Sequence, residues 1–421
     1  MKSAARDAKG LVDEVVSETA TPLSLLRRAS AAPLFVSRVI SSTGVGIGQV
    51  ALAWGVMETG YGAPELSLVL ACNAFPALLI VCGGVIGDRF RRHHVLMGAE
   101  ILACLSWLAL GGALSMDRAP LPLLCSLAGL GGVATAVFLP TVRGVIADLM
   151  AGRERPAGNA LINQTESVGH LIGFVSAGAV VTLVGPAWAA GARGAFCGIS
   201  AALLSRLVTQ RPGRTGSGPL RELWEGWREF KGRPWVWIMT LHCTVITTAL
   251  ACYMKTAGPL YTENGHGGAW AWGVISAALP LGSLAGALIG IRWKPAHLIP
   301  VSALLLTSVS IPLLLMGGGA PWQAIAVAAL VPGAAQAVYY VFWTTALQAE
   351  IPHAALVRVN SWNMVTGYAL MPVTVLLSGP LVAGFGLQAI VLATAAVPIA
   401  ATALTLLVLW LHSGIHAVRA S

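Results

Sequence analysis

Apolar runs of about twenty residues recur along most of this sequence, and only short polar segments separate them. One such segment is Gly83–Arg92 (GGVIGDRFRR), which lies between the apolar run Leu66–Cys82 and a second run that begins at Val95. Its aspartate and three arginines cannot lie in hydrocarbon, where a charged side chain costs about 2.5–3.5 kcal/mol or more. We therefore predict a short turn at a membrane surface, and the excess of arginine favours the cytoplasmic surface.

Composition agrees with a membrane protein. Of the 421 residues, 56% are hydrophobic and only 10% are charged, and the mean hydropathy is +0.75. A soluble domain has about 25% charged residues. Because about 20 apolar residues are needed to cross a bilayer, the length allows twelve spans and their loops. The predicted fold class is an all-α integral membrane protein with twelve transmembrane helices.

The basic residues are distributed unevenly. We place Arg118, Arg193 and Lys255 in outer connections and Arg38 inside the first helix, which leaves 22 of the 26 Lys and Arg for the tails, the cytoplasmic loops and the inner helix ends. This asymmetry predicts a multi-pass protein of the bacterial inner (plasma) membrane with both termini in the cytoplasm. It also explains the net charge of +9 without nucleic acid, which we reject as a partner.

The seven cysteines form no C-x-x-C pair, so the sequence supports neither a disulfide framework nor a zinc site, and we expect no metal and no cofactor. Residues 1–30 are polar and carry mixed charge, which excludes a cleavable signal peptide. The H-E-x-x-H, G-x-S-x-G and P-loop motifs are missing, so we do not expect an enzyme.

We predict five segments in the chain. They are a cytoplasmic N-terminal tail (1–31), a six-helix half (32–208), a cytoplasmic linker (209–233), a second six-helix half (234–412) and a cytoplasmic C-terminal tail (413–421). Apolar residues in the linker recur at helical spacing opposite basic ones, which predicts an amphipathic helix on the inner leaflet. The apolar face is Leu220, Leu223, Trp224, Trp227 and Phe230, and the basic residues are Arg221, Arg228 and Lys231.

The two halves resemble each other in sequence. Arg89 and Arg91 fall on Arg292 and Lys294 at an offset of 203 residues, and Asp148 falls on Glu350 at an offset of 202. We therefore predict two parallel, pseudo-symmetric halves. Small residues allow membrane helices to approach closely, so two glycine sets predict packing faces: Gly44, Gly46 and Gly48 in the first helix, and Gly282, Gly286 and Gly290 in the eighth.

The segment Gly83–Arg92 resembles the loop between helices 2 and 3 of the major facilitator superfamily, G-x-x-x-D-R-x-G-R-R/K. Gly84, Asp88, Arg89, Arg91 and Arg92 carry the match, and the second glycine of the motif is missing. Residues 139–173 and 347–381 look like the helix 4–5 and helix 10–11 regions of the exporter branch that includes macrolide-efflux and enterobactin-export proteins. The resemblance covers about residues 30–412.

This resemblance implies the major facilitator fold and secondary active transport by alternating access. The expected activity is efflux of a small amphipathic drug or natural product in exchange for protons, by a monomeric antiporter of the multidrug-resistance type. Two departures from the family pattern concern the coupling. Phe174 follows Gly173 where the antiporter signature has proline, and residues 123–142 lack the arginine that many drug–proton antiporters carry in helix 4.

The resemblance also implies an inner gate. Asp88, together with Arg89, Arg91 and Arg92, would hold that gate shut through contacts with helix 11, near Asn360, and with the end of helix 4, near Arg143. The alternative is a basic loop that serves only to orient the chain in the membrane.

Ionisable residues inside membrane helices suggest proton coupling. Glu166 and His170 are four residues apart, so they share one face of the fifth helix and could relay a proton. The alternative is that Glu166 lies near the interface and pairs with Arg143 or Arg155. Glu100 is a third candidate, near the inner end of its helix.

A substrate cavity is expected between the halves near the midplane. Aromatic walls are predicted from Trp54, Tyr339 and Trp343. For His242, which is one of the polar candidates, the alternative is a hydrogen bond to a neighbouring helix. The polar candidates are Gln49, Asn73, His242, Gln336, Tyr340 and Asn363.

Fold does not fix function, so two alternatives to export remain. One is an importer or lipid flippase on the same fold, and the other is a transport-inactive receptor or scaffold.

Overall fold

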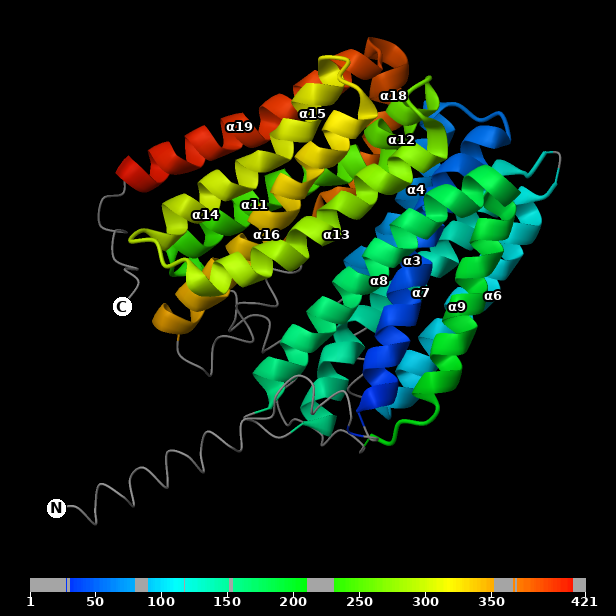
Figure 1. Cartoon of the computed structure of the whole chain (residues 1–421), viewed down its shortest axis with the longest axis horizontal. Coiled ribbons are helices and arrows are strands. Elements are labelled where there is room, and N and C mark those ends of the chain that lie inside the picture. The colour runs from blue at the N-terminus through cyan, green and yellow to red at the C-terminus, as the bar shows by residue number, and fades with distance from the viewer. Residues whose placement is uncertain are drawn as a thin grey trace.

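The computed structural model describes residues 28, 31–79, 90–116, 118–150, 154–209, 231–351, 366–367 and 369–411, without the side chains of Ala147 and Pro156. Every regular element in these ranges is a helix. Ten helices are long and apolar enough to cross a membrane, and two shorter apolar helices, Ala63–Leu79 and Met371–Phe385, border stretches outside the described ranges. The twelve helices form two bundles of six (Figure 1), which confirms the predicted fold class.

The N-terminal half contains six spans. They are α3 (Ala32–Glu58), α4 (Ala63–Ala74) with its 3₁₀ extension η1 (Phe75–Leu79), α6 (Arg92–Leu114), α7 (Leu121–Leu149), α8 (Arg155–Val184) and α9 (Pro186–Leu204).

The C-terminal half repeats this order with two irregular spans. The first span consists of α11 (Pro234–Cys252), the π-helical turn η2 (Tyr253–Ala257) and α12 (Gly258–Glu263). The others are α13 (Gly268–Arg292), the series α14 (Leu298–Leu306), η3 (Thr307–Val309) and α15 (Ser310–Gly317), then α16 (Trp322–Glu350), α18 (Met371–Phe385) and α19 (Leu387–Leu411).

Equivalent hydrogen bonds confirm the internal repeat. The Tyr61 hydroxyl donates to the Ala119 carbonyl at 2.9 Å, and the Tyr261 hydroxyl donates to the Ala320 carbonyl at the same distance. Tyr61 and Tyr261 lie about 200 residues apart in the sequence, and so do Ala119 and Ala320. Each half therefore ties its own loops in the same way. Gly185 and Gly386 also correspond, since each ends a helix with a φ of +90° or +83° that side chains disfavour.

Glycine allows the helices inside each half to approach closely, as the sequence predicts. A methyl group on Gly46 of α3 would lie 2.9 Å from the carbonyl carbon of Gly173 in α8. Methyl groups on Gly282 and Gly286 of α13 would overlap the backbone of α16 at Leu330 and Ala334. Both predicted packing faces are therefore confirmed.

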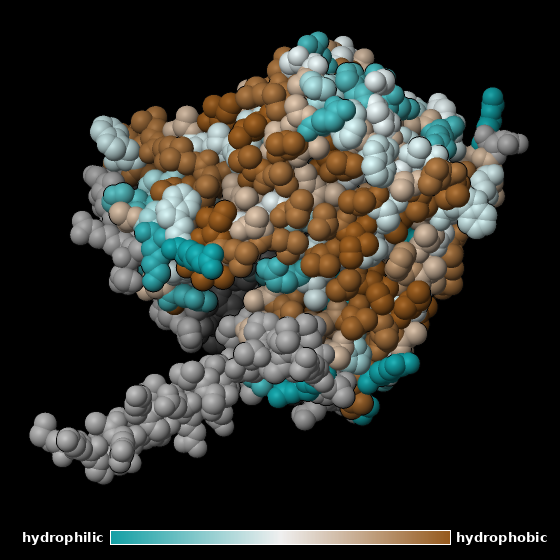
Figure 2. Space-filling view, in the orientation of Figure 1, coloured by the Kyte–Doolittle hydropathy of each residue, from teal (hydrophilic) through white to brown (hydrophobic). Residues whose placement is uncertain are grey.

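The two ends of the molecule differ in how closely the halves meet. We call the end at which α3 begins the proximal end, and the end at which α3 finishes and α4 begins the distal end. Near the distal end α8 contacts α13 and α4 contacts α18, and toward the proximal end α8 and α13 diverge (Figure 1). Apolar side chains cover the flanks of both halves, and hydrophilic ones gather at the two ends (Figure 2), as expected of a chain that spans a bilayer.

Candidate functional site

The distal interface between the halves is built from glycine. A methyl group on Gly273 of α13 would lie 2.7 Å from the Phe174 carbonyl oxygen and 2.9 Å from the Gly178 Cα of α8. A methyl group on Gly379 of α18 would overlap α4 at the Ala63 carbonyl oxygen and the Ser67 side chain, and the Ser67 hydroxyl donates to the Leu376 carbonyl at 3.1 Å. We call these contacts the distal interface. They close the region between the halves from that end.

Half-buried polar groups from both halves lie on the proximal side of this interface. In α3 every residue of the stretch Ser41–Met57 is buried except Val45 and Gln49, which share one face. The turn η2 contacts α3, and its Lys255 is half-buried. His170 of α8 is also half-buried and lies within electrostatic range of Lys255.

The third ionisable residue in this region is Glu166 of α8, one turn before His170. Its carboxylate pairs with the Arg38 guanidinium of α3, and its side chain keeps 29% exposure whereas that of Arg38 keeps 7%. The Arg38 guanidinium also lies 4.9 Å from the centre of the Phe138 ring. We call Glu166, His170 and Lys255 the central polar site.

A second charged group lies inside the N-terminal half, behind α3. Glu100 of α6 is buried and accepts a hydrogen bond of 3.1 Å from the Ser200 hydroxyl of α9. The Arg193 guanidinium lies 3.9 Å from the centre of the Trp107 ring and donates to the Val45 carbonyl at 3.4 Å. Glu100 lies within electrostatic range of Arg193.

The polar core of the C-terminal half contains hydroxyls and one imidazole. His242 Nε2 lies 2.9 Å from the Thr402 hydroxyl, and the Thr307 hydroxyl donates to Thr402 at 2.7 Å. Nearer the distal end the Ser378 hydroxyl donates to Thr256 at 2.8 Å. These bonds fix α11 and α14–α15 against α19, and η2 against α18.

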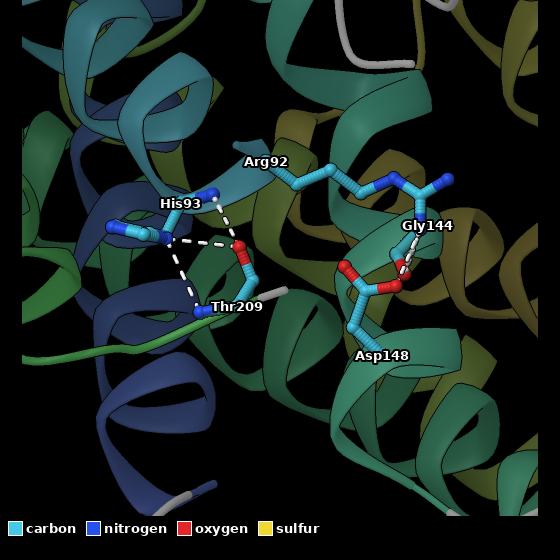
Figure 3. A network of polar contacts seen from close by, with 5 residues as sticks. All are labelled: Arg92, His93, Gly144, Asp148 and Thr209. Carbon is cyan, nitrogen blue, oxygen red and sulfur yellow. Dashed lines mark hydrogen bonds and ion pairs between the residues drawn. The ribbon is translucent and has the colours of Figure 1, made fainter. Parts of the chain in front are cut away.

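At the proximal end polar contacts join elements of the N-terminal half (Figure 3). Arg92 at the start of α6 donates to the Gly144 carbonyl at 3.1 Å and pairs with Asp148 of α7 at 2.6 Å. The Thr209 backbone N–H donates to His93 Nδ1 at 3.2 Å, and the backbone N–H of His93 donates to the Thr209 hydroxyl at 3.3 Å. These contacts fix the start of α6 to the end of α7 and to the segment after α9.

The predicted gating residues are only partly described. Asp88 and Arg89 lie outside the described residues. Arg91 is exposed at the residue before α6, and Arg143 is exposed on α7. Arg92 has its ion pair with Asp148 inside the N-terminal half. The described members of the set therefore gather at the proximal end of one half.

The predicted substrate residues are distributed over several environments. Asn73 donates to the Ala128 carbonyl at 2.9 Å and so joins α4 to α7. His242 is buried between α11 and α19, in the environment named as the alternative. Gln336 and Tyr340 are exposed and four residues apart on α16. Gln49 lies on the half-buried face of α3, and Asn363 lies outside the described residues.

The aromatic residues predicted as cavity walls are buried instead. Trp54 is buried in α3. The Tyr339 and Trp343 rings stack with centroids 6.2 Å apart, and Trp343 meets Trp235 edge-on at 5.8 Å. Because these rings fill the cores of their halves, the prediction that they form open walls is wrong.

Two basic residues lie in other places than the sequence suggested. Arg193 lies two turns inside α9, where Gly48 of α3 leaves room for its side chain. Lys255 lies in η2, inside its span, because the helical segment continues past it to Glu263. Their predicted position in outer connections is therefore wrong. A signal was present for Arg193, since Gly44 and Gly48 lie four residues apart on one face of α3 and both border Arg193, but none was present for the π-helical turn.

Comparisons with known proteins agree with this architecture. Residues 34–373 match the model of the Major Facilitator Superfamily. Over 360 residues the chain is 29% identical to the enterobactin exporter EntS of Escherichia coli O6:K15:H31 (strain 536 / UPEC), which covers 83% of this chain and 85% of that protein. EntS of Shigella boydii serotype 18 is also 29% identical, with the same coverage.

Solved structures show the same fold. The nucleoside transporter NupG superposes with a TM-score of 0.71 at 10% identity, over 89% of this chain and 98% of that one. A bacterial homologue of the human lysosomal transporter Spinster, in an inward-facing and unoccupied conformation, gives a TM-score of 0.69 at 15% identity, over 93% and 100% of the two chains.

Proposed function

The chain belongs to the major facilitator superfamily, and from this premise we propose that it is a secondary active exporter of a small amphipathic molecule, a drug or natural product. The observation that carries the proposal is the distal interface. The halves meet there through Gly178, Gly273 and Gly379, while half-buried polar side chains of both halves lie on the proximal side of these contacts. Alternating access requires such a contact at one end, which must break when the other end closes.

Export, rather than import, is supported by the relatives. The two EntS proteins are enterobactin exporters, and each aligns with more than four fifths of this chain. We place the proximal end, with both termini and the linker 209–233, in the cytoplasm, because the basic residues concentrate there. The protein would then accept its substrate from the inner side of the bacterial inner membrane, as a monomer.

Protons are the proposed coupling ion, and Glu166 with His170 is the proposed coupling pair. Glu166 is held by Arg38 but stays partly exposed, so it can be reached by water and can exchange a proton. Protonation would remove the charge that holds Arg38, which changes the contact between α3 and α8. Glu100 is the weaker candidate because it is buried against Ser200.

The proximal gate is a separate part of the proposal. Asp88, Arg89 and Arg91 would act there with Arg143, and the Arg92–Asp148 pair would keep the start of α6 in place while the gate opens. If the chain were a receptor or scaffold, Asp88→Asn would leave its function unchanged, whereas a transporter would lose turnover at normal expression.

The proposal is tested by the accumulation of amphipathic dyes and macrolides in cells that express the chain, with and without a protonophore. We expect lower accumulation than in empty cells, and we expect the protonophore and Glu166→Gln each to abolish the difference. Higher accumulation would indicate an importer. If accumulation across the whole panel is the same as in empty cells, this proposal of amphipathic efflux is wrong.

The glycines of α18 provide a matched pair for the distal interface. Gly379→Ala places a methyl group against α4, whereas a methyl group on Gly384 meets no atom within 4 Å. Overpacking costs about 1–3 kcal/mol, so we expect Gly379→Ala to lower efflux about tenfold by destabilising the distally closed state. Gly384→Ala should retain wild-type efflux. Equal efflux by the two variants would show that this contact does not form during transport.

A further inference from the structure

Lys255 is a cation deep inside a membrane span. It lies eight residues, or about 12 Å, before the distal end of its helix at Glu263, which is too far for its four-carbon stem to bring the amine to that surface. The residues that follow it toward the distal end, Thr256–Thr262, are all buried, while Lys255 itself is half-buried. The side chain lies within electrostatic range of His170 of α8 and of Arg193 of α9, both in the other half.

The charges around Lys255 do not balance. Among the described residues, five charged side chains lie more than one turn from the ends of their membrane spans: Arg38, Glu100, Glu166, Arg193 and Lys255. Glu166 pairs with Arg38, and Glu100 lies in the field of Arg193. In the part of the chain that the structure describes, no carboxylate lies within ion-pair distance of Lys255. Among the described residues, one positive charge is thus left over inside a membrane span.

This unbalanced cation has a cost that the fold does not recover. A lysine at the centre of a membrane helix costs about 2.5–3.5 kcal/mol on insertion scales. Arg193 adds to this cost, because its positive guanidinium lies within electrostatic range of Lys255. Lys255 also lies in a π-helical turn, which is a backbone irregularity that is frequent at functional sites.

We propose that Lys255 binds an anionic group of the transported molecule, so that the substrates of this chain are anionic amphipaths. This inference rests on the proposed function and names the substrate class of the same site. The amine supplies the charge and up to three hydrogen-bond donors. His170 of α8 lies within electrostatic range of Lys255 in the other half, so an anion bound between the two would contact both halves. Glu166 does not repel the anion strongly, because Arg38 neutralises it.

Two xanthene dyes of similar size and opposite charge test the proposal. The full chain is placed in nanodiscs of phosphatidylcholine, and the binding of fluorescein, an anion, and rhodamine 123, a cation, is measured by fluorescence anisotropy. We expect the wild type to prefer fluorescein by at least about tenfold, and Lys255→Gln to lose that preference. Lys255→Arg, which keeps the charge, should retain it. Lys231→Gln removes an exposed lysine at the proximal end and should bind as the wild type does.

Several outcomes would overturn the proposal. These are a wild type that does not bind fluorescein, a wild type that binds both dyes equally, and a Lys255→Gln variant that keeps the preference. The proposed function fails separately. Protonophore-sensitive efflux of rhodamine 123 without fluorescein binding would support export and refute the anion site. Binding of fluorescein through Lys255 in a chain that exports nothing would support the anion site and refute export.

Discussion

In the N-terminal half the polar groups of the core carry full charges, with Arg38 paired to Glu166 and Arg193 placed over Trp107. In the C-terminal half the corresponding space holds His242 and a series of threonine and serine hydroxyls. The framework is nevertheless the same, since both halves use a tyrosine hydroxyl to tie their distal loops.

This difference shows which features of a duplicated fold are free to change. The loop ties and the helix-ending glycines set the backbone path, so both copies retain them. The polar side chains of the core determine whether a half can respond to protonation. A carboxylate such as Glu166 loses its charge on protonation, whereas threonine and serine hydroxyls do not titrate near neutral pH, and His242 of the C-terminal core is buried against Thr402. Under the proposed proton coupling, the response to protons would belong to the N-terminal half, and the C-terminal half would be the frame that carries Lys255.

The largest expected effect is in the ionic core. Arg38→Met leaves the Glu166 carboxylate without its cation, which should lower the free energy of unfolding in detergent by about 2–3 kcal/mol; the value is below that for a fully buried pair because Glu166 is partly exposed. The double variant Arg38→Met/Glu166→Met removes both charges and should be more stable than the single variant. A double variant as unstable as Arg38→Met would show that the pair is not the cause.

A smaller effect is expected in the hydroxyl core. Thr402→Val removes the partner of both His242 and Thr307, and should lower the free energy of unfolding by about 1–2 kcal/mol. Proton-coupled efflux per folded molecule should not change. Thr345→Val is the control, because Thr345 is exposed and bonds only its own helix at Val341. A loss of proton coupling in Thr402→Val would place part of the coupling in the C-terminal half.

The smallest effects concern the shared loop ties. Tyr61→Phe and Tyr261→Phe each remove one hydrogen bond, so each should cost about 0.5–1.5 kcal/mol, measured by thermal unfolding in detergent. The two losses should be similar and should add in the double variant, because the ties lie in different halves. Clearly unequal losses would mean that the duplicated framework has diverged in stability as well.

The sequence predicts most of the fold. The helix count follows from runs of about twenty apolar residues, a length that the bilayer thickness sets. The duplication follows from residue matches at offsets of 202 and 203. The glycine contacts between α3 and α8, and between α13 and α16, were also predictable, because three-residue and four-residue spacing places small side chains on one face. The π-helical turn was not, because one extra residue in a helical turn leaves no mark on hydropathy.

The site is less predictable, because it depends on which helix faces meet. Glu166 and His170 were identified from their spacing, but the ion pair of Glu166 joins residues 128 positions apart, and no local pattern indicates Arg38 as the partner. Tyr339 and Trp343 were assigned to a cavity wall because they are aromatic and near the midplane. Their burial depends on contacts with Trp235, which belongs to another helix.

The glycine contacts of the distal interface have a consequence for the speed of opening. Where two helices interlock through leucines, side chains must change rotamer before the helices can part. Gly178 and Gly273 meet backbone to backbone, so no rotamer barrier opposes their separation at that contact. The halves are then expected to part and rejoin there on the microsecond-to-millisecond timescale of domain motions, and the slow step of a transport cycle would lie elsewhere, in the exchange of partners among the charged groups.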